Sequence, residues 1–361
     1  MIKFLDLHKI NQRFEKTFQS QLNTFFSKGR YILGEHVAHF ENQFALLNQD
    51  QFCIGVGNGL DALSLIFKGY MALGKLQKGD EVLVPAHTYI ASILALTEIG
   101  LVPVLVEPNE KTFLIDTSLL QDKITPKTKA ILVVHLYGRL ANMVALNTIA
   151  QQNNLLLVED CAQSHGVNET SSHSKAFSFY PGKNLGCLGD GGAITTNDEA
   201  LATLLFKLRN YGSAVKYIHE IQGVNSRLDE IQALFLSIKL PFLNQDNLRR
   251  QAIAKRYRNE IKNPLIQLPH WDEVTPHAFH LFVIRTQHRD ALQSYLTAQG
   301  IETLIHYPIP PHKQKAFEGW NNLTFPITEK LHQEVLSLPM SPVMTDDEVL
   351  YVIQKVSAWT L

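Results

Sequence analysis

Short apolar runs recur through roughly the first two thirds of the chain. Most are apolar at successive positions instead of alternating between apolar and polar residues, which predicts strands buried on both faces of a largely parallel sheet. Seven such strands are expected, over residues 52–56, 81–85, 102–106, 130–135, 155–160, 175–179 and 192–196. Helical periodicity lies between several of them, as over 61–73 and 91–100. Alternating strands and helices indicate an α/β architecture.

The pattern changes near Leu240. Residues 244–261 read as a long charged helix, whose interleaved acidic and basic residues favour a solvated surface over a nucleic-acid contact. A strand over 277–286, a helix over 290–301 and a closing helix over 346–359 follow. We therefore predict a large domain over 1–240 and a smaller C-terminal α+β domain over 241–361.

Composition excludes several classes of protein. The chain has 361 residues, of which 45% are hydrophobic and 19% charged, and its net charge is -1. These values predict a soluble globular protein without the basic surface that nucleic acid or an anionic membrane requires. No run approaches the ~20 apolar residues of a membrane span, and no signal peptide is recognisable. The three cysteines, Cys53, Cys161 and Cys187, lack metal-type spacing and are expected to be packing residues in a reducing cytoplasm.

The glycine-rich segment after the sixth predicted strand carries the strongest chemical signal. Lys183 lies in a loop that holds five glycines between Gly182 and Gly192. Glycine lets the backbone approach a ligand closely. Partial burial would lower the pKa of the Lys183 amine, as Schiff-base chemistry requires. Taken alone, a loop lysine is more often a surface charge, so both interpretations stay open at this point.

Three further segments place suitable groups at strand ends. Asp160 ends a predicted strand, where ligands bind in open α/β sheets, and its carboxylate needs a cationic partner unless it caps a helix. Gly57, Asn58 and Gly59 lead into a helix whose N-terminus can hold a phosphate, although a plain turn has the same sequence. Tyr89 is placed either to stack on a flat ring or simply to pack.

Together and in this order, these segments resemble the sugar-nucleotide aminotransferases of the DegT–StrS family. The resemblance spans nearly the whole chain and includes GRYILGEHVAHFENQFA, GNGLDAL, PAHTYIAS, VHLYG, EDCAQSHG, FSFYPGKNLGCLGDGGAITT, GVNSRLDEIQA and HYPIPPH. It implies pyridoxal 5′-phosphate (PLP) as cofactor and the aspartate-aminotransferase fold (PLP fold type I). That fold has a large domain with a mainly parallel seven-stranded sheet and a smaller C-terminal α+β domain.

The resemblance also implies roles for the residues around the cofactor ring. Lys183 would bind the cofactor covalently and later move a proton between carbon atoms. Asp160 would pair with the pyridine nitrogen and keep it protonated, which strengthens the ring as an electron sink. Gln163 would contact the phenolic oxygen of the ring, and Tyr89 would stack on its face.

Other implied roles concern the phosphate and the substrate. The phosphate would be held by residues of two turns: Gly57, Asn58, Gly59 and Ser178. Asn225 would reach the phosphate of the neighbouring subunit's cofactor, which would make a homodimer with shared active sites obligatory. His306 and Tyr307, in HYPIPPH, would lie near the substrate.

The substrate is predicted from GNGLDAL and RNYGSAVKYIHEIQGVNSRLDE. These segments look most like the subgroup that aminates carbon 3 of dTDP-linked 3-keto-6-deoxyhexoses with L-glutamate, for deoxysugars of lipopolysaccharide or S-layer glycans. A C4 aminotransferase acting on a 4-keto-6-deoxyhexose is the alternative. A related pyridoxamine-dependent dehydratase would have histidine in place of Lys183. A regulatory DNA-binding protein would need a basic patch, and none is seen.

Two departures from the family pattern and one metal hypothesis complete the prediction. The stretch 165–177 is shorter than usual in the family, and Leu60 stands where many members have a small hydroxyl residue. One phosphate hydrogen bond would then be lost at Leu60 or supplied by Asn58. His277 and His280 have a metal-like spacing, but in a strand they would point to opposite faces, so no metal is expected.

Overall fold

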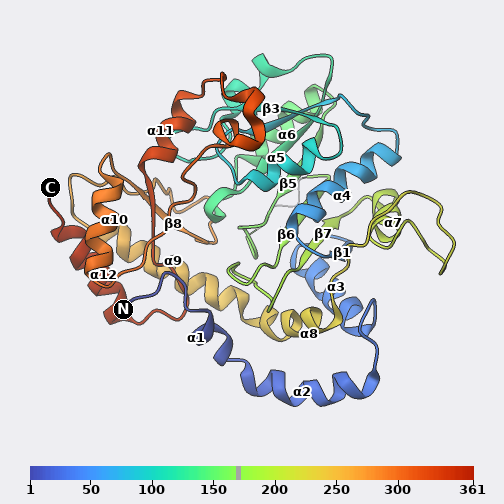
Figure 1. The fold of residues 1–361 in the computed structure, drawn as a ribbon, viewed down its shortest axis with the longest axis horizontal. Helices are drawn as coiled ribbons and strands as arrows, with labels where there is room; N and C mark the ends of the chain where they lie inside the picture. Colours follow the sequence, from blue (N-terminus) through green and yellow to red (C-terminus); the bar gives the residue numbers. More distant parts are fainter. Residues whose placement is uncertain (168–171) are drawn as a thin grey trace.

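A seven-stranded sheet forms the centre of the molecule in the computed structural model, which describes residues 1–167 and 172–361 (Figure 1). Its strands are β1 (Phe52–Val56), β2 (Glu81–Pro85), β3 (Val102–Val106), β4 (Thr128–Val134), β5 (Leu156–Asp160), β6 (Ser174–Ser178) and β7 (Gly192–Thr196). Their order is β1-β7-β6-β5-β4-β2-β3. Only β7 is antiparallel to its neighbours, β1 and β6. The predicted mainly parallel sheet is confirmed.

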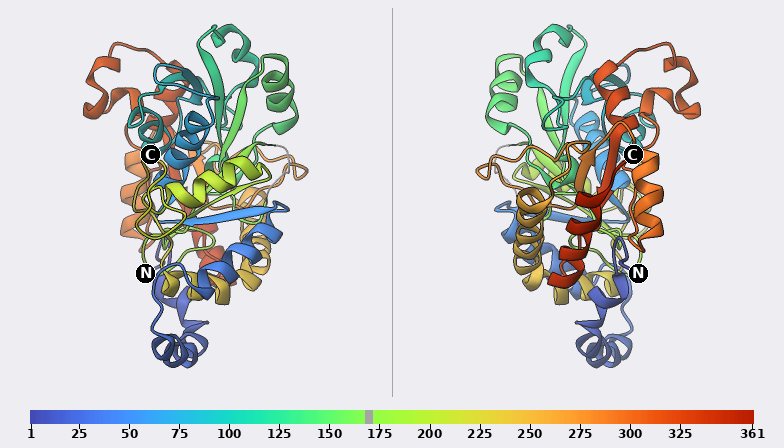
Figure 2. Two further views of the ribbon diagram at one scale, coloured as in Figure 1. Left: turned by 90° about the vertical axis from the view of Figure 1, so that its right-hand side faces the viewer. Right: turned by 90° about the vertical axis from the view of Figure 1, so that its left-hand side faces the viewer.

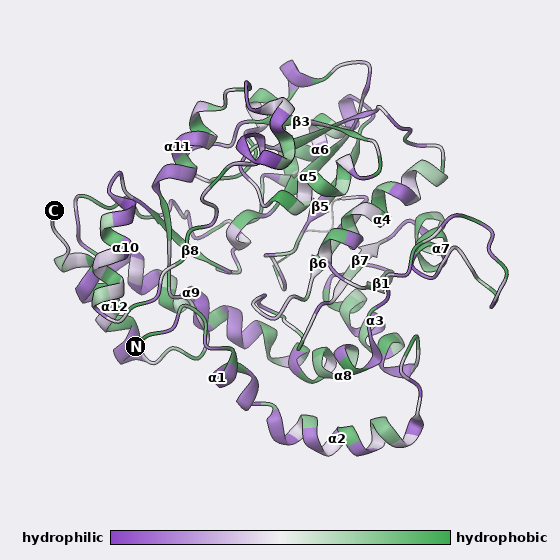
Figure 3. Ribbon diagram, in the orientation of Figure 1, coloured by the Kyte–Doolittle hydropathy of each residue, from purple (hydrophilic) through white to green (hydrophobic). Residues whose placement is uncertain are grey.

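Both faces of the sheet are buried, because alternate residues of a strand point to opposite sides. One face packs on α4 (Gly59–Ala72), α5 (Ile90–Thr97) and α7 (Glu199–Leu208) through Ile54, Val56, Val82, Val84, Leu132, Val158 and Ile194. The other packs on α3 (Glu35–Leu47), α6 (Met143–Gln152) and α8 (Glu230–Lys239) through Cys53, Leu83, Ile131, Val133, Leu157, Phe177 and Ala193. The helix α5 and the strand β3 are accordingly coloured mostly hydrophobic in Figure 3.

The C-terminal part is built on a second, two-stranded sheet. β8 (Phe282–Arg285) pairs antiparallel with β9 (Val335–Leu338). A core that includes Tyr257, Phe282 and Val352 joins this sheet to its helices. These helices are α9 (Leu243–Glu260), α10 (Arg289–Ala298) and α12 (Asp346–Ala358). The helix α11 (Pro326–Glu334) precedes β9 and packs through Leu331 on a core of the large sheet. The N-terminus lies against this part, where Ile2 bridges Ile301.

The sequence analysis predicted a strand over 277–286 and a domain boundary at 240/241 in this region. The predicted strand over 277–286 was too long, because its first half pairs with the segment after β4 instead. There Ala278 N–H donates to Gly138 O (2.7 Å) and Leu281 N–H donates to Tyr137 O (3.3 Å). The domain boundary at 240/241 stays a prediction; it falls in the 3-10 turn Leu240–Phe242 between α8 and α9.

The first helices were not predicted from the sequence. They are α1 (Leu7–Gln12), α2 (Glu15–Lys28) and α3. Phe18 and Phe25 of α2 pack on Leu234 and Phe235 of α8, at one edge of the molecule (Figures 1 and 2).

One carboxylate holds the start of α3. Glu230 accepts hydrogen bonds from the N–H groups of Gly34 (2.7 Å), His36 (3.0 Å) and Val37 (2.9 Å). A negative charge at this helix end is favourable, because the first N–H groups of a helix lack internal partners. A Cβ at Gly34 would lie 2.7 Å from Glu230 Oε2, so glycine is required for this close approach.

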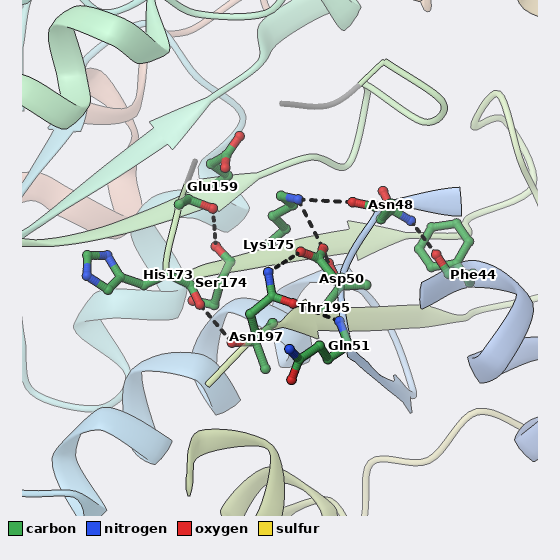
Figure 4. Close-up of polar contacts among 12 residues, drawn as sticks. Phe44, Asn48, Asp50, Gln51, Glu159, His173, Ser174, Lys175, Thr195 and Asn197 are labelled. Carbon is green, nitrogen blue, oxygen red and sulfur yellow. Dashed lines mark hydrogen bonds and ion pairs between the residues drawn. The ribbon is translucent and has the colours of Figure 1, made fainter. Parts of the chain in front are cut away.

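A buried polar network fastens two strands to the loop before β1 (Figure 4). Lys175 of β6 is 2% exposed, and its Nζ lies 3.0 Å from Asp50 Oδ2. Thr195 of β7 donates to the same oxygen (2.5 Å), and Asn197 Nδ2 donates to Asp50 Oδ1 (3.2 Å). The buried carboxylate is thus compensated by one cation and two neutral donors.

Two further observations concern the described residues. None of their helices combines the length and the apolar character that a membrane crossing requires. Cys53, Cys161 and Cys187 are free and buried. Burial raises the pKa of all three thiols, that of Cys187 to about 11.

Candidate active site

The predicted catalytic groups meet where the parallel strands end. Asp160 is the last residue of β5 and Ser178 the last of β6, and Lys183 lies in the loop that follows β6. Asp160 is 8% exposed; its Oδ2 accepts a hydrogen bond from Ser92 Oγ (2.8 Å) and its Oδ1 one from Ala162 N–H (3.1 Å). Two donors therefore hold this carboxylate at the edge of the sheet.

Lys183 is an unusual lysine. It is half-buried, and within the described part of the chain its Nζ has no hydrogen bond or ion pair. Burial lowers the pKa of its amine from 10.5 to about 8, and the nearby charge of Asp160 opposes this only in part. Much more of the amine is therefore neutral near pH 7 than in an ordinary lysine, which is the form that attacks a carbonyl carbon.

Neutral imidazoles surround this amine. Burial and the charge of Lys183 lower the pKa of His165 to about 3 and that of His306 to about 4. The same two causes hold the pKa of His280 well below its usual value. Asp160 is thus the group whose charge compensates Lys183.

Gln163 and two tyrosines form one group near Asp160. Gln163 Oε1 accepts the N–H of Tyr137 (2.5 Å), and its Nε2 donates to the hydroxyl of Tyr307 (3.1 Å). Tyr89 is 52% exposed, and its ring centroid lies 5.1 Å from that of Tyr307. The exposed part of the Tyr89 ring is therefore available to a ligand.

Residues of the two predicted turns come together. We call this group, which consists of Gly57, Asn58, Gly59 and Ser178, the cup. Asn58 caps α4, because its Oδ1 accepts Asp61 N–H (2.8 Å). A Cβ at Gly59 would lie 2.7 Å from Ser178 Cβ, so only glycine lets this turn approach the end of β6. Gly57 N–H donates to Ser226 Oγ (2.9 Å). A helix N-terminus beside a serine is suited to a phosphate.

Asn225 is the predicted residue that the single chain does not bring into the site. It is exposed, its backbone pairs with that of Asn210, and its side chain makes no hydrogen bond within the described residues. Its neighbour Ser226 contacts the cup through Gly57 and donates to Asp61 Oδ2 (2.6 Å). The role of Asn225 toward a second subunit stays a prediction.

His306 and Tyr307 lie beside these groups, joined by a cis peptide bond. His306 Nδ1 is 2.8 Å from Ser337 Oγ, and its carbonyl accepts the hydroxyl of Tyr137 (2.5 Å). Burial raises the pKa of Tyr307, which therefore keeps its proton. Tyr307 thus contacts Gln163, and His306 lies near enough to Lys183 for the lysine charge to act on it. Their contact with a substrate stays a prediction.

Sequence reasoning missed Ser92, Tyr137 and Asn184. Asn184 follows Lys183 and donates to Asn247 Oδ1 (2.9 Å) and Ala278 O (3.0 Å), which ties the lysine loop to the C-terminal part. Ser92 and Tyr137 lie in PAHTYIAS and VHLYG, and their position within these motifs was the available signal. The expected shortening within 165–177 includes residues 168–171, which lie outside the described residues.

One buried cluster among the described residues has the composition of a metal site. Potential ligand atoms of His135, Glu159 and Cys161 lie within 4.8 Å of one another. However, His135 Nδ1 accepts Ala141 N–H (3.1 Å), so its Nε2 carries the proton and donates to Glu159 Oε2 (2.5 Å). A hydrogen bond accounts for this cluster. His277, in turn, stacks on Phe279 with ring centroids 3.7 Å apart.

Comparison with known proteins identifies the family. The sequence profile of the DegT/DnrJ/EryC1/StrS aminotransferase family matches residues 12–357. The chain belongs to this family. It is 53% identical to the dTDP-3-amino-3,6-dideoxy-alpha-D-galactopyranose transaminase of Aneurinibacillus thermoaerophilus, over 99% of both chains.

Solved structures agree over the whole fold. DesV of Streptomyces venezuelae, solved in complex with a ketimine intermediate, has a TM-score of 0.95 and 44% identity, over 99% of this chain and 98% of that one. NtdA of Bacillus subtilis, solved with bound cofactor PMP, has a TM-score of 0.89 and 32% identity, over 94% of this chain and 80% of that one. The expected aminotransferase activity, fold and PLP cofactor are confirmed.

The described residues fit this cofactor. A lysine amine with lowered pKa faces a strand-end carboxylate, and a glycine cup without room for a Cβ lies at the end of the neighbouring strand. These are the groups that an aldehyde, a protonated ring nitrogen and a phosphate require.

Proposed function

We propose that this aminotransferase transfers the amino group of L-glutamate to carbon 3 of a dTDP-linked 3-keto-6-deoxyhexose, giving a dTDP-3-amino-3,6-dideoxyhexose. The observation that carries the chemistry is the lowered pKa of Lys183. Burial lowers it to about 8, although the charge of Asp160 acts in the opposite direction. The choice of carbon 3 is supported by the relative from Aneurinibacillus thermoaerophilus, which is named for a 3-amino-3,6-dideoxy sugar.

Each residue has a distinct task in this proposal. PLP, when bound, supplies a ring that withdraws electrons from the substrate carbon. Asp160 would hold the proton of the ring nitrogen, with Ser92 keeping the carboxylate in place. Gln163 would donate the second proton of its Nε2 to the ring oxygen, and Tyr89 would cover one face of the ring.

Proton transfer is assigned to Lys183. When not bound to the cofactor, the neutral amine of Lys183 would serve as a general base and then as a general acid, holding the proton at its Nζ between the two events. Because the surrounding histidines have lowered pKa values, they do not compete as cations for Asp160. Gly57, Asn58, Gly59 and Ser178 would hold the phosphate, and His306 and Tyr307 would contact the sugar nucleotide.

The complete site would need a homodimer, with Asn225 serving the phosphate site of the other subunit. Exposed apolar side chains in the segment that precedes Asn225 support an interface there: Tyr217 is 82% exposed and Ile218 57%. The three free cysteines fit a cytoplasmic enzyme. A pathway to lipopolysaccharide or S-layer deoxysugars is part of the proposal.

The test is a half-reaction followed by absorbance. The purified enzyme, converted to its aminated form with L-glutamate, is mixed with a dTDP-3-keto-6-deoxyhexose or with the 4-keto isomer. Return of the PLP band with the 3-keto sugar alone is expected, whereas return with the 4-keto sugar alone would establish the C4 alternative. Borohydride reduction followed by peptide mapping should label Lys183. The variant Lys183→Arg should lose this label and the reaction, with Lys123→Arg as an exposed control.

A further inference from the structure

Tyr137 is a buried residue that contacts two parts of the site: Gln163 on the cofactor side, and His306 in the segment proposed to contact the sugar nucleotide. It follows β4, is 4% exposed, and has a left-handed backbone with φ 62°. A residue with a Cβ is strained in this region, so its surroundings must hold it there. Besides its carbonyl, which accepts the N–H of Leu281, Tyr137 is held by its backbone N–H and by its phenol.

The backbone contact settles the orientation of Gln163. Because the N–H of Tyr137 can only donate, the amide oxygen of Gln163 must face it, at 2.5 Å. The Nε2 group therefore points the other way and donates to the Tyr307 hydroxyl at 3.1 Å. One proton of Nε2 is left for a ligand.

The phenol makes the second contact, and its partners can also be assigned. Its proton goes to the carbonyl oxygen of His306, 2.5 Å away, since a carbonyl only accepts. The same phenol oxygen lies 3.0 Å from His87 Nε2, so His87 must be the donor there. His87 is completely buried, and burial holds its pKa well below the usual value, so its imidazole is neutral with the proton on Nε2.

These contacts close a ring. It runs from the Tyr137 backbone through Gln163 to Tyr307, along the chain to His306, and back to the Tyr137 phenol. We propose that Tyr137, oriented by His87, is a positioning residue that holds Gln163 on the cofactor side and the His306–Tyr307 segment on the sugar-nucleotide side in one arrangement. The inference rests on the proposed function.

The ring makes the two sides separable by mutation. Tyr137→Phe removes the phenol contact to His306 but keeps the backbone N–H that orients Gln163. In the holoenzyme we expect the KM for the 3-keto sugar nucleotide to rise about tenfold, as for the loss of a buried hydrogen bond, with kcat within about twofold. The Kd of the aminated sugar nucleotide, measured by calorimetry, should rise equally. The cofactor absorbance band should not move.

Tyr257→Phe is the matched control. Tyr257 is buried like Tyr137 and donates its hydroxyl to a carbonyl, Pro339 O at 2.9 Å, but within the core of the C-terminal part. The variant Tyr257→Phe should lower Tm without changing the KM for the 3-keto sugar nucleotide. An equal rise in KM in both variants would reduce the effect to stability and overturn the inference.

Two measurements test the ring itself. Combining Tyr137→Phe with Tyr307→Phe should raise KM by less than the product of the single effects, because both break the same ring. Nitrogen-15 NMR of the holoenzyme should show His87 protonated on Nε2. Wild-type turnover is measured first. Its absence would contradict the proposed function, whereas turnover with an unchanged KM in Tyr137→Phe would contradict only the role of Tyr137.

Discussion

The chemistry of this site depends on how one amine is desolvated. Lys183 sits half-buried among neutral imidazoles, and burial lowers its pKa to about 8 although Asp160 favours the charged form. Two opposite effects act on the pKa of this amine: burial penalises its charged form and lowers the pKa, while the Asp160 carboxylate stabilises that form and raises the pKa. The result is an amine that can be neutral or protonated near physiological pH.

A pH dependence follows for cofactor attachment. Only the neutral amine attacks the PLP aldehyde, so the rate of condensation with cofactor-free protein should rise about tenfold per pH unit and level off above a pH of about 8. Stopped-flow absorbance between pH 6 and 11 measures this. Nα-acetyl-lysine amide, the control, should level off near its ordinary pKa of about 10.4. A plateau at that higher pH in the protein would contradict the burial of Lys183.

At the residue scale, the sequence located the groups that lie at strand ends, whereas their roles stay predictions. Asp160 and Lys183 were predicted because each lies at or just after a buried strand. The hydrogen bond from Ser92 to Asp160 spans 68 positions, so it depends on how α5 packs on the sheet. Tyr137 was missed because a tyrosine is not a residue that predicts left-handed backbone. Its strain is visible only with its partners in place.

At the scale of elements, the long-range pairings decide what the sequence can reveal. The seven strands were placed within about two residues, because burial on both faces gives each a continuous apolar run. β9 was missed, since its partner β8 lies about 50 residues earlier and four residues carry little pattern. The helices α1 to α3 were also missed. The apolar side chains of α2 pack on α8, and those of α3 pack on the sheet and on α8, so their burial depends on elements far along the chain.

The Lys175 network gives a stability prediction at this scale. Lys175→Met leaves Asp50 buried without its cation and should lower the free energy of unfolding by about 3 kcal/mol or more. Lys75→Met is the control, because Lys75 forms a 3.0 Å pair with Asp198 but is 44% exposed. Its loss should cost at most about 1 kcal/mol. Urea unfolding measures both.

A second variant separates charge from packing. The double variant Lys175→Met/Asp50→Asn removes both charges and should unfold at a higher urea concentration than Lys175→Met alone. If the double variant is no more stable, the lost packing of the lysine stem explains the effect instead.

At the scale of the whole molecule, the candidate active-site residues lie together at the carboxyl ends of the parallel strands. Six of the seven strands run in the same direction, so Asp160 and Ser178 end side by side, and the turn after β1 meets them. The C-terminal part contributes His306 and Tyr307 to the same edge. This gathering was predictable from the parallel pattern. The homodimer that the resemblance implies stays a prediction, since Asn225 is exposed in the single chain.

Subunit mixing tests the proposed homodimer. Lys183→Arg and Asn225→Ala should each be nearly inactive alone. If Asn225 serves the other subunit, a mixed dimer has one site with both substitutions and one with neither. Random re-association should therefore restore about a quarter of wild-type activity. Re-association of Lys183→Arg with wild type calibrates exchange. No recovery despite verified exchange would place Asn225 in its own subunit's site or outside both.

The buried cysteines have a practical consequence for such an experiment. Thiolates are the reactive form, and all three native thiols are enclosed with raised pKa values. The native cysteines of the folded enzyme should therefore react little with maleimide dyes. A single cysteine introduced on an exposed helix would carry the sole fluorophore, so donor- and acceptor-labelled subunits could report exchange directly by energy transfer.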